Sequence, residues 1–262
     1  MIRIAMIGDI VGRPGRKILQ EKLPWLIDAH HLDAVIVNGE NAAGGFGITP
    51  EIAEDIFQCG VDVITSGNHI WDQKKIEPYI EDQPRLLRPA NYPTGNKGRG
   101  DVIISSKNVP EIKIGVISLS GRIFMGPLDC PFQTVVPLIE KMQAETKVVI
   151  IDFHAEATSE KMAMAWYLDG RVSVLAGTHT HVQTADERLL PGGTAYITDL
   201  GMTGPMDSVI GMKEDRVISK FLTARPNRFE VASGNIQLHG VLIEVDEEQG
   251  VAQRIARIKL KF

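Results

Sequence analysis

The sequence predicts an α/β protein, and three observations lead to this prediction. Short apolar segments alternate with amphipathic helical patterns in the N-terminal half of the chain. Short polar motifs follow these and later apolar segments at the points where the predicted strands end. The C-terminal stretch alternates apolar and polar residues, as antiparallel strands with one solvated face do. Two sets of strands flanked by helices predict a four-layer α/β/β/α sandwich. Because the chain shows no repeat or linker, we expect one domain over residues 1–262.

The N-terminal elements follow from periodicity and capping residues. Leu19, Leu23 and Leu26 recur at helical spacing. Thr49 followed by Pro50 is typical of a helix start, because the first turn has no use for the N–H that proline lacks. In order, we predict a strand at Ile2–Ile7, a helix at Arg16–Ala29, a strand at Ala34–Asn38, a helix from Thr49 to about Cys59–Gly60, and a strand at Val61–Thr65. Strands joined by helices of this length predict parallel pairing through right-handed crossovers.

The pattern is looser in the second half, where proline and glycine interrupt it. We predict irregular loops at Arg88–Gly100, Gly121–Pro131 and Gly201–Gly211, because each is rich in glycine or proline. The predicted strands are Asp101–Ser105, Lys113–Leu119, Lys147–Phe153, Val172–Ala176, Phe229–Ser233, Ile236–Val245 and Val251–Phe262, with one helix at Glu214–Leu222. The last three strands alternate and are expected to pair antiparallel.

The composition excludes several classes of function. Apolar residues make up 44% and charged residues 23% of the 262 residues, which is typical of a soluble globular protein. A net charge of −5 argues against an extended nucleic-acid duplex as partner. No apolar run is long enough to span a membrane, and a strand at the N-terminus leaves no room for a signal peptide. Cys59 and Cys130 have no metal-binding spacing, so we expect reduced core thiols in a cytoplasmic protein. Homo-oligomers are common among enzymes of this size, and we expect one here.

Five polar motifs carry the chemistry. They are Gly-Asp at 8–9, Asn-Gly-Glu-Asn at 38–41, Gly-Asn-His at 67–69, Asp-Phe-His at 152–154 and Gly-Thr-His-Thr-His at 177–181. Carboxylates, carboxamides and imidazoles suit first-row divalent metals. Because parallel strands gather their carboxyl ends at one edge of a sheet, these motifs should converge on one site. Together they indicate a hydrolase with two metal ions.

Each motif taken alone has a simpler interpretation. Asp9 could cap a helix or a turn, and Glu40 beyond its strand could be merely solvated. Asn68 is a common turn residue, and a lone His154 is more often a hydrogen-bonded core residue than a ligand. The pair His179 and His181 is the strongest signal, because residues i and i+2 of an extended segment face the same way. We assign no role to the three other histidines, His30, His31 and His239.

The order of the motifs resembles the calcineurin-like metallophosphoesterases, whose series is D-x-H, G-D, G-N-H, a lone histidine and G-H-x-H. The resemblance runs from Gly8 to His181 with three departures. Val11 replaces the histidine of D-x-H, Glu40 replaces the usual bridging aspartate, and Thr178 separates glycine from the first histidine of the last motif. These changes, with Gly-Asp-Ile-Val-Gly and Asn-Gly-Glu-Asn-Ala-Ala-Gly-Gly, resemble the YmdB-like phosphodiesterases acting on 2′,3′-cyclic nucleotides.

The resemblance implies a four-layer fold of the metallophosphoesterase type and a dinuclear site. Asp9, Glu40, Asn41 and His181 would hold one metal, and Glu40, Asn68, His154 and His179 the other, with Glu40 bridging. Asn41 would supply an oxygen at the coordination position that the family's D-x-H histidine occupies, and this favours iron or manganese over zinc. His69 would be the general acid that protonates the leaving oxygen, or a hydrogen-bond donor to the phosphoryl group.

The implied reaction is hydrolysis of a 2′,3′-cyclic nucleotide, such as 2′,3′-cyclic AMP, to a 3′-nucleotide. Two divalent ions exceed the charge of Asp9 and Glu40, so the site would stay cationic, attract a phosphate and favour a bridging hydroxide as nucleophile. The same chemistry on another phosphate ester is an alternative. A second alternative is a regulatory partner protein of RNA metabolism with a structural metal site; the presence of His69, which is no ligand, argues against it.

Overall fold

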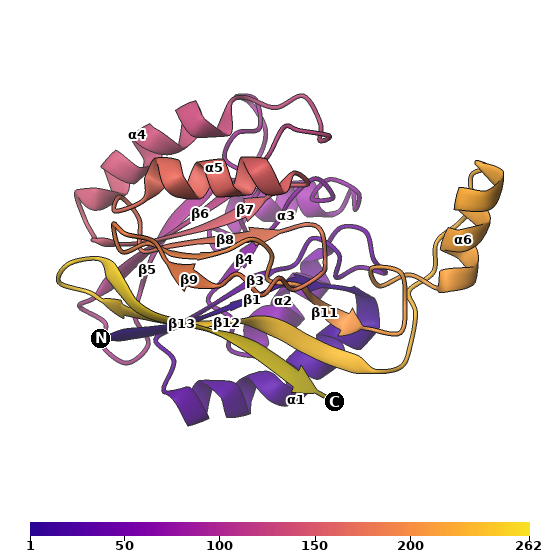
Figure 1. Cartoon of the computed structure of the whole chain (residues 1–262), viewed down its shortest axis with the longest axis horizontal. Helices are drawn as coiled ribbons and strands as arrows, with labels where there is room; N and C mark the ends of the chain where they lie inside the picture. The colour runs from indigo at the N-terminus through magenta and orange to yellow at the C-terminus, as the bar shows by residue number, and fades with distance from the viewer.

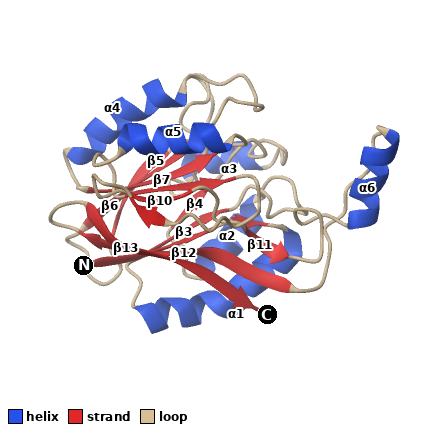
Figure 2. Ribbon diagram, in the orientation of Figure 1, coloured by secondary structure: helices blue, strands red, loops and turns tan.

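The computed structural model describes residues 1–262 as a mixed α/β fold with two β-sheets and six helices (Figure 1, Figure 2). The seven-stranded sheet has the order β2-β11-β12-β1-β3-β4, with β13 paired to β12. Its strands are β1 (Ile2–Ile7), β2 (Asp9–Ile10), β3 (Ala34–Asn38), β4 (Val63–Thr65), β11 (Met202–Pro205), β12 (Ile236–Asp246) and β13 (Val251–Lys261). The prediction of an α/β protein is confirmed.

The second sheet has six strands in the order β5-β6-β7-β8-β10-β9. These strands are β5 (Asp101–Ser105), β6 (Lys113–Ser120), β7 (Val148–His154), β8 (Val174–Thr178), β9 (Arg188–Leu189) and β10 (Ala195–Ile197). The helices are α1 (Gly12–His30), α2 (Pro50–Gln58), α3 (Ile76–Asp82), α4 (Pro131–Gln143), α5 (Thr158–Leu168) and α6 (Glu214–Thr223). Figure 2 shows α1 on one side of the strands, α4 and α5 on the other, and α6 projecting away from the rest.

Three buried apolar clusters explain why these segments form these layers. One cluster lies between the two sheets and joins Ile4 and Ile36 of the first to Val116 and Ile150 of the second. A second cluster packs α1 and α2 on the first sheet, and a third packs α4 and α5 on the second. Both faces of the central strands are therefore buried, which is why β3 and β7 begin with continuous apolar runs rather than alternating ones, before the polar residues at their ends.

The predicted strand pairing is confirmed where it bears on the site. β1 pairs parallel to β3 and β3 pairs parallel to β4, so three strands of the first sheet end at the same edge. β6, β7 and β8 are parallel in the second sheet. β12 and β13 form the expected antiparallel pair.

Several sequence predictions are wrong in detail. The segment Gly201–Gly211 is not only a loop, because Met202–Pro205 forms β11 and pairs with both β2 and β12. Phe229–Ser233 is not a strand, since only Val231 makes an isolated bridge, to Met212. Cys59 and Cys130 are free thiols, but both are half-buried rather than core residues.

Three helices, α3, α4 and α5, were not predicted at all. Pro131 begins α4 and Pro137 lies inside it, so the segment looks like a continuation of the proline-rich loop. In α5 the polar residues Glu160 and Lys161 are buried, which removes the apolar stripe that periodicity relies on. Other elements begin at different residues than predicted: α1 begins at Gly12, β4 at Val63, β7 at Val148 and β8 at Val174. None of the six helices combines the length and the apolarity that crossing a membrane requires.

Candidate metal centre

The residues singled out in the sequence lie at the carboxyl ends of strands from both sheets. Asp9 lies just past the carboxyl end of β1, as the first residue of β2, while Glu40 and Asn41 follow β3. Asn68 and His69 follow β4, His154 is the last residue of β7, and His179 and His181 follow β8. The two sheets face each other, so the motifs converge between sheets rather than along the edge of one sheet.

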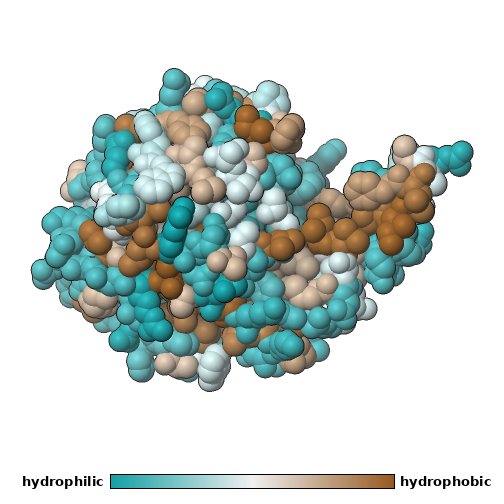
Figure 3. Space-filling view, in the orientation of Figure 1, coloured by the Kyte–Doolittle hydropathy of each residue, from teal (hydrophilic) through white to brown (hydrophobic).

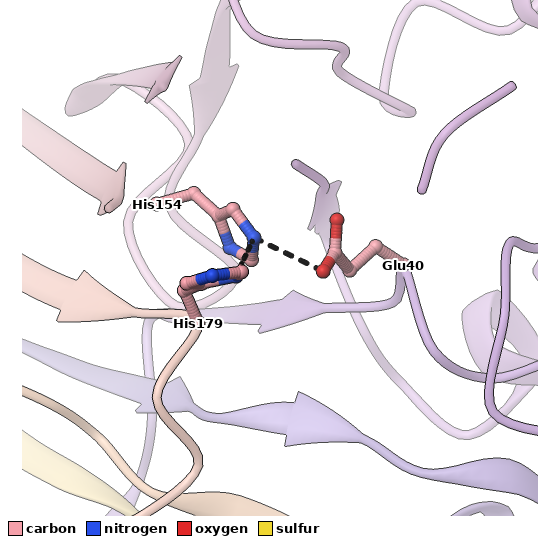
Figure 4. Close-up of side chains that lie close together, drawn as sticks. All are labelled: Glu40, His154 and His179. Atoms are coloured by element: carbon pink, nitrogen blue, oxygen red, sulfur yellow. Dashed lines mark hydrogen bonds and ion pairs between the residues drawn. The ribbon is translucent and has the colours of Figure 1, made fainter. Parts of the chain in front are cut away.

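The first group of side chains surrounds His154 Nε2. This atom lies 3.0 Å from Glu40 Oε1, 3.0 Å from Asn68 Oδ1 and 3.0 Å from His179 Nδ1. Figure 4 shows Glu40, His154 and His179 pointing toward one another from three different segments. One donor atom from each of these three residues lies within 4.8 Å of the others, which is the spacing that ligands of a common metal ion need.

The second group surrounds the side-chain amide of Asn41. Its nitrogen lies 3.4 Å from Asp9 Oδ1, 3.3 Å from Glu40 Oε1 and 3.2 Å from His181 Nε2. His181 Nε2 and Asp9 Oδ1 are 3.6 Å apart. Glu40 is therefore shared by both groups, and every residue of the predicted ligand set belongs to one group or both.

Hydrogen bonds behind the histidines fix which ring nitrogen faces each group. Thr178 Oγ1 donates to Asp152 Oδ1 at 2.7 Å, so its lone pair is free to accept from His154 Nδ1–H at 3.0 Å. His181 Nδ1–H donates to the carbonyl of Ile210 at 2.9 Å. In both residues Nε2 faces the cluster, so it is the nitrogen whose lone pair can bind a metal ion once any proton on it has left.

Asp152 also connects the two sheets beneath the cluster. Asn38, at the end of β3, donates to Asp152 Oδ2 at 3.0 Å and accepts from the backbone N–H of Glu40 at 3.2 Å. Asp152 is 1% exposed, and burial raises its pKa to about 6. The same carboxylate thus orients His154 through Thr178 and the Glu40 backbone through Asn38.

Asp152 and Thr178 were not among the predicted site residues, although both lie inside the five polar motifs. One signal was available for Asp152, since residues i and i+2 of a strand share a face and Asp152 precedes His154 by two. For Thr178 no signal was available, because its role depends on the position of β8 beside β7.

The two histidines of the His-x-His pair do not lie on one side of an extended segment, so that argument was wrong. β8 ends at Thr178, and the following His179 and His181 have φ angles of 96° and 65°. This left-handed backbone turns His179 toward His154 and His181 toward Asp9. The pair therefore contributes one imidazole to each group.

Close charges shift the pKa values inside the cluster. Burial opposes ionisation of Asp9, but its hydrogen bond and ion pair with His181 outweigh burial and lower the pKa of Asp9. Burial likewise opposes the charge of His181, and Asp9 outweighs it and raises the pKa of His181 to about 9. Burial together with nearby His154 lowers the pKa of His179 to about 4. The carboxylate and the His179 imidazole are thus in metal-binding form at neutral pH, whereas His181 would release a proton on binding.

Only a glycine fits at position 67, beside His154. A Cβ atom there would lie 2.1 Å from the His154 ring carbon Cδ2, far inside contact distance. The glycine of the Gly-Asn-His motif therefore lets the β4 end approach the imidazole closely enough for Asn68 to reach it.

His69 lies at the rim of the cluster rather than within it. Its backbone N–H donates to Glu40 Oε2 at 3.0 Å, while its ring Nδ1 lies 2.8 Å from Asp72 Oδ2. The side chain is 28% exposed and lines a cavity of about 620 Å³ together with Glu40 and His179. His69 is thus placed to meet a molecule in the cavity while its backbone holds Glu40.

The rest of the cavity wall is mainly apolar, apart from Asn41, His181 and Lys220, and most of it comes from residues 209–229. It includes Phe46, Met212, Phe221 and Phe229. Phe221 belongs to α6, the helix that projects from the body in Figure 1. Figure 3 shows apolar side chains gathered along this projection. The cavity therefore joins a polar, imidazole- and carboxylate-lined half to an apolar half.

Two sheets with a carboxylate, carboxamide and imidazole cluster at their strand ends are the features of the metallophosphoesterase class of α/β proteins. The comparisons with known proteins agree with this class. The chain belongs to the YmdB-like protein family, whose model matches residues 5–258. The family resemblance seen in the motifs is confirmed.

Relatives match nearly the whole chain. A Bacillus subtilis protein named 2′,3′-cyclic-nucleotide 2′-phosphodiesterase is 49% identical over 257 residues, covering 98% of this chain and 96% of the relative. The crystal structure of a hypothetical protein from Thermus thermophilus superposes with a TM-score of 0.92 at 39% identity and covers 99% of both chains. A structure described as a novel phosphatase of Mycoplasma pneumoniae gives a TM-score of 0.92 at 36% identity, covering 99% of this chain and 93% of that one.

Proposed function

We propose that this protein is a metal-dependent phosphodiesterase that hydrolyses 2′,3′-cyclic nucleotides to 3′-nucleotides. The observation that carries the proposal is the pair of donor groups that share Glu40 and open into one cavity. The name of the Bacillus subtilis relative supports the choice of substrate. The three buried clusters likewise support a single four-layer α/β/β/α fold of the metallophosphoesterase type over residues 1–262.

Seven residues would hold two divalent ions. Glu40 would contribute to both, with Asp9, Asn41 and His181 at one ion and Asn68, His154 and His179 at the other. The donors fit this assignment, because the far nitrogens of His154 and His181 are hydrogen-bonded and their Nε2 atoms face the cluster. Four of the seven residues carry an oxygen donor, which favours manganese or iron over zinc. The amide of Asn41, whose nitrogen faces the cluster here, would have to turn to present its oxygen. When bound, such ions supply an acidified water and neutralise phosphate charge.

The chain's own residues would bind and protonate the substrate. Phe46, Phe221 and Phe229 of the cavity wall offer apolar surface to a nucleobase. The ring of Phe46 lies 5.2 Å from that of His69, so this surface adjoins the proposed proton donor. His69 would give a proton to the leaving 2′ oxygen, since Asp72 holds its Nδ1 and leaves Nε2 as the free ring nitrogen.

Metal content and substrate range test the proposal together. The purified protein is analysed for metals per chain and assayed with bis-p-nitrophenyl phosphate, p-nitrophenyl phosphate and 2′,3′-cyclic AMP. We expect two transition-metal ions per chain and turnover of the diester and the cyclic nucleotide. Activity on the monoester alone would support a phosphatase, as the Mycoplasma pneumoniae structure is described. A protein without metal or activity after addition of manganese or iron would refute the proposal.

A further inference from the structure

A buried ion pair lies behind the His-x-His turn, outside the proposed ligand set. Lys161 of α5 and Asp199, which follows β10, are 1% and 0% exposed, and Lys161 Nζ lies 2.8 Å from Asp199 Oδ2. The lysine stem fills the space above Gly177, where a Cβ atom would meet Lys161 Cδ at 2.8 Å. Burying both charges is unfavourable unless other donors complete their hydrogen bonds, so the pair needs an explanation.

The donors that complete the pair come from the residue between the two histidines. Asp199 Oδ2 accepts from the backbone N–H of Thr180 at 3.1 Å and from its hydroxyl at 2.6 Å. Thr180 therefore makes both of its donor bonds to a single carboxylate oxygen. On either side of it, His179 and His181 have positive φ angles of 96° and 65°, which residues other than glycine rarely adopt.

The other oxygen of Asp199 fixes the strand beside Asp9. Asp199 Oδ1 accepts from the N–H of Gly201 at 2.8 Å. The next residue, Met202, pairs with Asp9 in the β11–β2 ladder and donates its N–H to the carbonyl of His181 at 3.1 Å. One carboxylate thus holds the turn that carries both histidines and the start of β11, the strand that pairs with Asp9.

We propose that the Lys161–Asp199 pair positions the two histidines of the metal centre, His179 and His181, by holding Thr180 between them. It holds the turn in a left-handed conformation, so that His179 faces His154 and His181 faces Asp9. An unrestrained turn would relax to negative φ angles and withdraw one or both imidazoles. This inference rests on the proposed function, because it takes His179 and His181 as ligands.

Thr180 is the best residue at which to test this positioning role, because it is half-buried and its variants keep both Lys161 and Asp199. Thr180→Val removes the hydroxyl bond to Asp199 and keeps the shape of the side chain, whereas Thr180→Ser keeps the hydroxyl. Asp199→Asn weakens the same contacts from the other side. Thr198→Val is the matched control, because it removes a threonine hydroxyl bond to a different carboxylate, that of Asp186.

The measurement is titration of Mn²⁺ into metal-free protein by calorimetry, with circular dichroism and thermal unfolding to confirm folding. Loss of a partner that orients a metal ligand typically weakens metal affinity about 10- to 100-fold, and we expect this for Thr180→Val and Asp199→Asn. Thr180→Ser and Thr198→Val should bind Mn²⁺ as the unaltered protein does.

Two other outcomes separate this inference from the proposed function. If Thr180→Val and Asp199→Asn unfold at lower temperature but bind two Mn²⁺ ions with unchanged affinity, the pair is only structural and the inference fails. If the unaltered protein binds no Mn²⁺, iron or other transition metal, the proposed function fails first.

Discussion

Replacing His69 with alanine should abolish most turnover of a cyclic nucleotide without disturbing metal binding. The ring of His69 contacts Asp72 at 2.8 Å. The hydrogen bond between His69 and the ligand set comes from its backbone N–H, which lies 3.0 Å from Glu40 Oε2. Alanine keeps that N–H. The substitution therefore removes a proton donor from the cavity and leaves the two donor groups in place.

The size of the effect depends on the leaving group. General acid catalysis is typically worth about 10²- to 10⁴-fold, which corresponds to about 2.7–5.4 kcal/mol of barrier. The 2′ oxygen of a cyclic nucleotide leaves as a basic alkoxide and needs the proton. A p-nitrophenolate is a weak base and leaves without one. Turnover of 2′,3′-cyclic AMP should thus fall by the full factor, and turnover of bis-p-nitrophenyl phosphate by much less.

The assay compares kcat for the two substrates in His69→Ala, with metals per chain measured on the same sample. His30→Ala, at the end of α1, is the matched control for loss of a histidine. An equal loss on both substrates with metal retained would refute a general acid and favour a hydrogen-bond donor to the phosphoryl group. A loss of metal in His69→Ala would indicate a structural role for the side chain. Asp72→Asn should reduce cyclic-nucleotide turnover in the same direction by a smaller factor.

Three further predictions concern the metal centre. Glu40→Gln should reduce metal content at both positions, because Glu40 is the one side chain common to the two groups; elemental analysis showing one ion fully retained would contradict this. Gly67→Ala should destabilise the protein by about 1–3 kcal/mol in urea unfolding, because the new Cβ would lie 2.1 Å from the His154 ring; unchanged stability would show that the turn can shift. The stability of the metal-free protein should fall as pH rises toward 9, because the folded-state pKa of His181, about 9, exceeds the ordinary value of 6.5. That contribution is fully present below pH 6.5 and lost through pH 9, so urea unfolding of His181→Asn should show a smaller fall over this range.

The sequence predicts best where a local pattern and the final environment agree. β1 and β3 have the predicted bounds, because a strand buried between two layers is largely apolar. β5 also has the predicted bounds, although it is a partly exposed edge strand. Helix α2 is also correct, since Thr49 caps it through its side chain, which accepts from Ile52 N–H at 3.3 Å. Helix α5 was missed because its buried face includes Lys161, and only the distant Asp199 makes that burial tolerable.

The sequence by itself determined which functional groups stand at the ends of the strands, namely carboxylates, carboxamides and imidazoles. It also determined the family to which the chain belongs. Strand ends can be read locally, because periodicity and capping depend on near neighbours. Tertiary structure alone decided how these functional groups are arranged around one another. The turn that separates His179 from His181 depends on Asp199, and the orientation of His154 depends on Thr178 from the neighbouring strand. Such contacts join residues far apart in the chain, so no local pattern contains them.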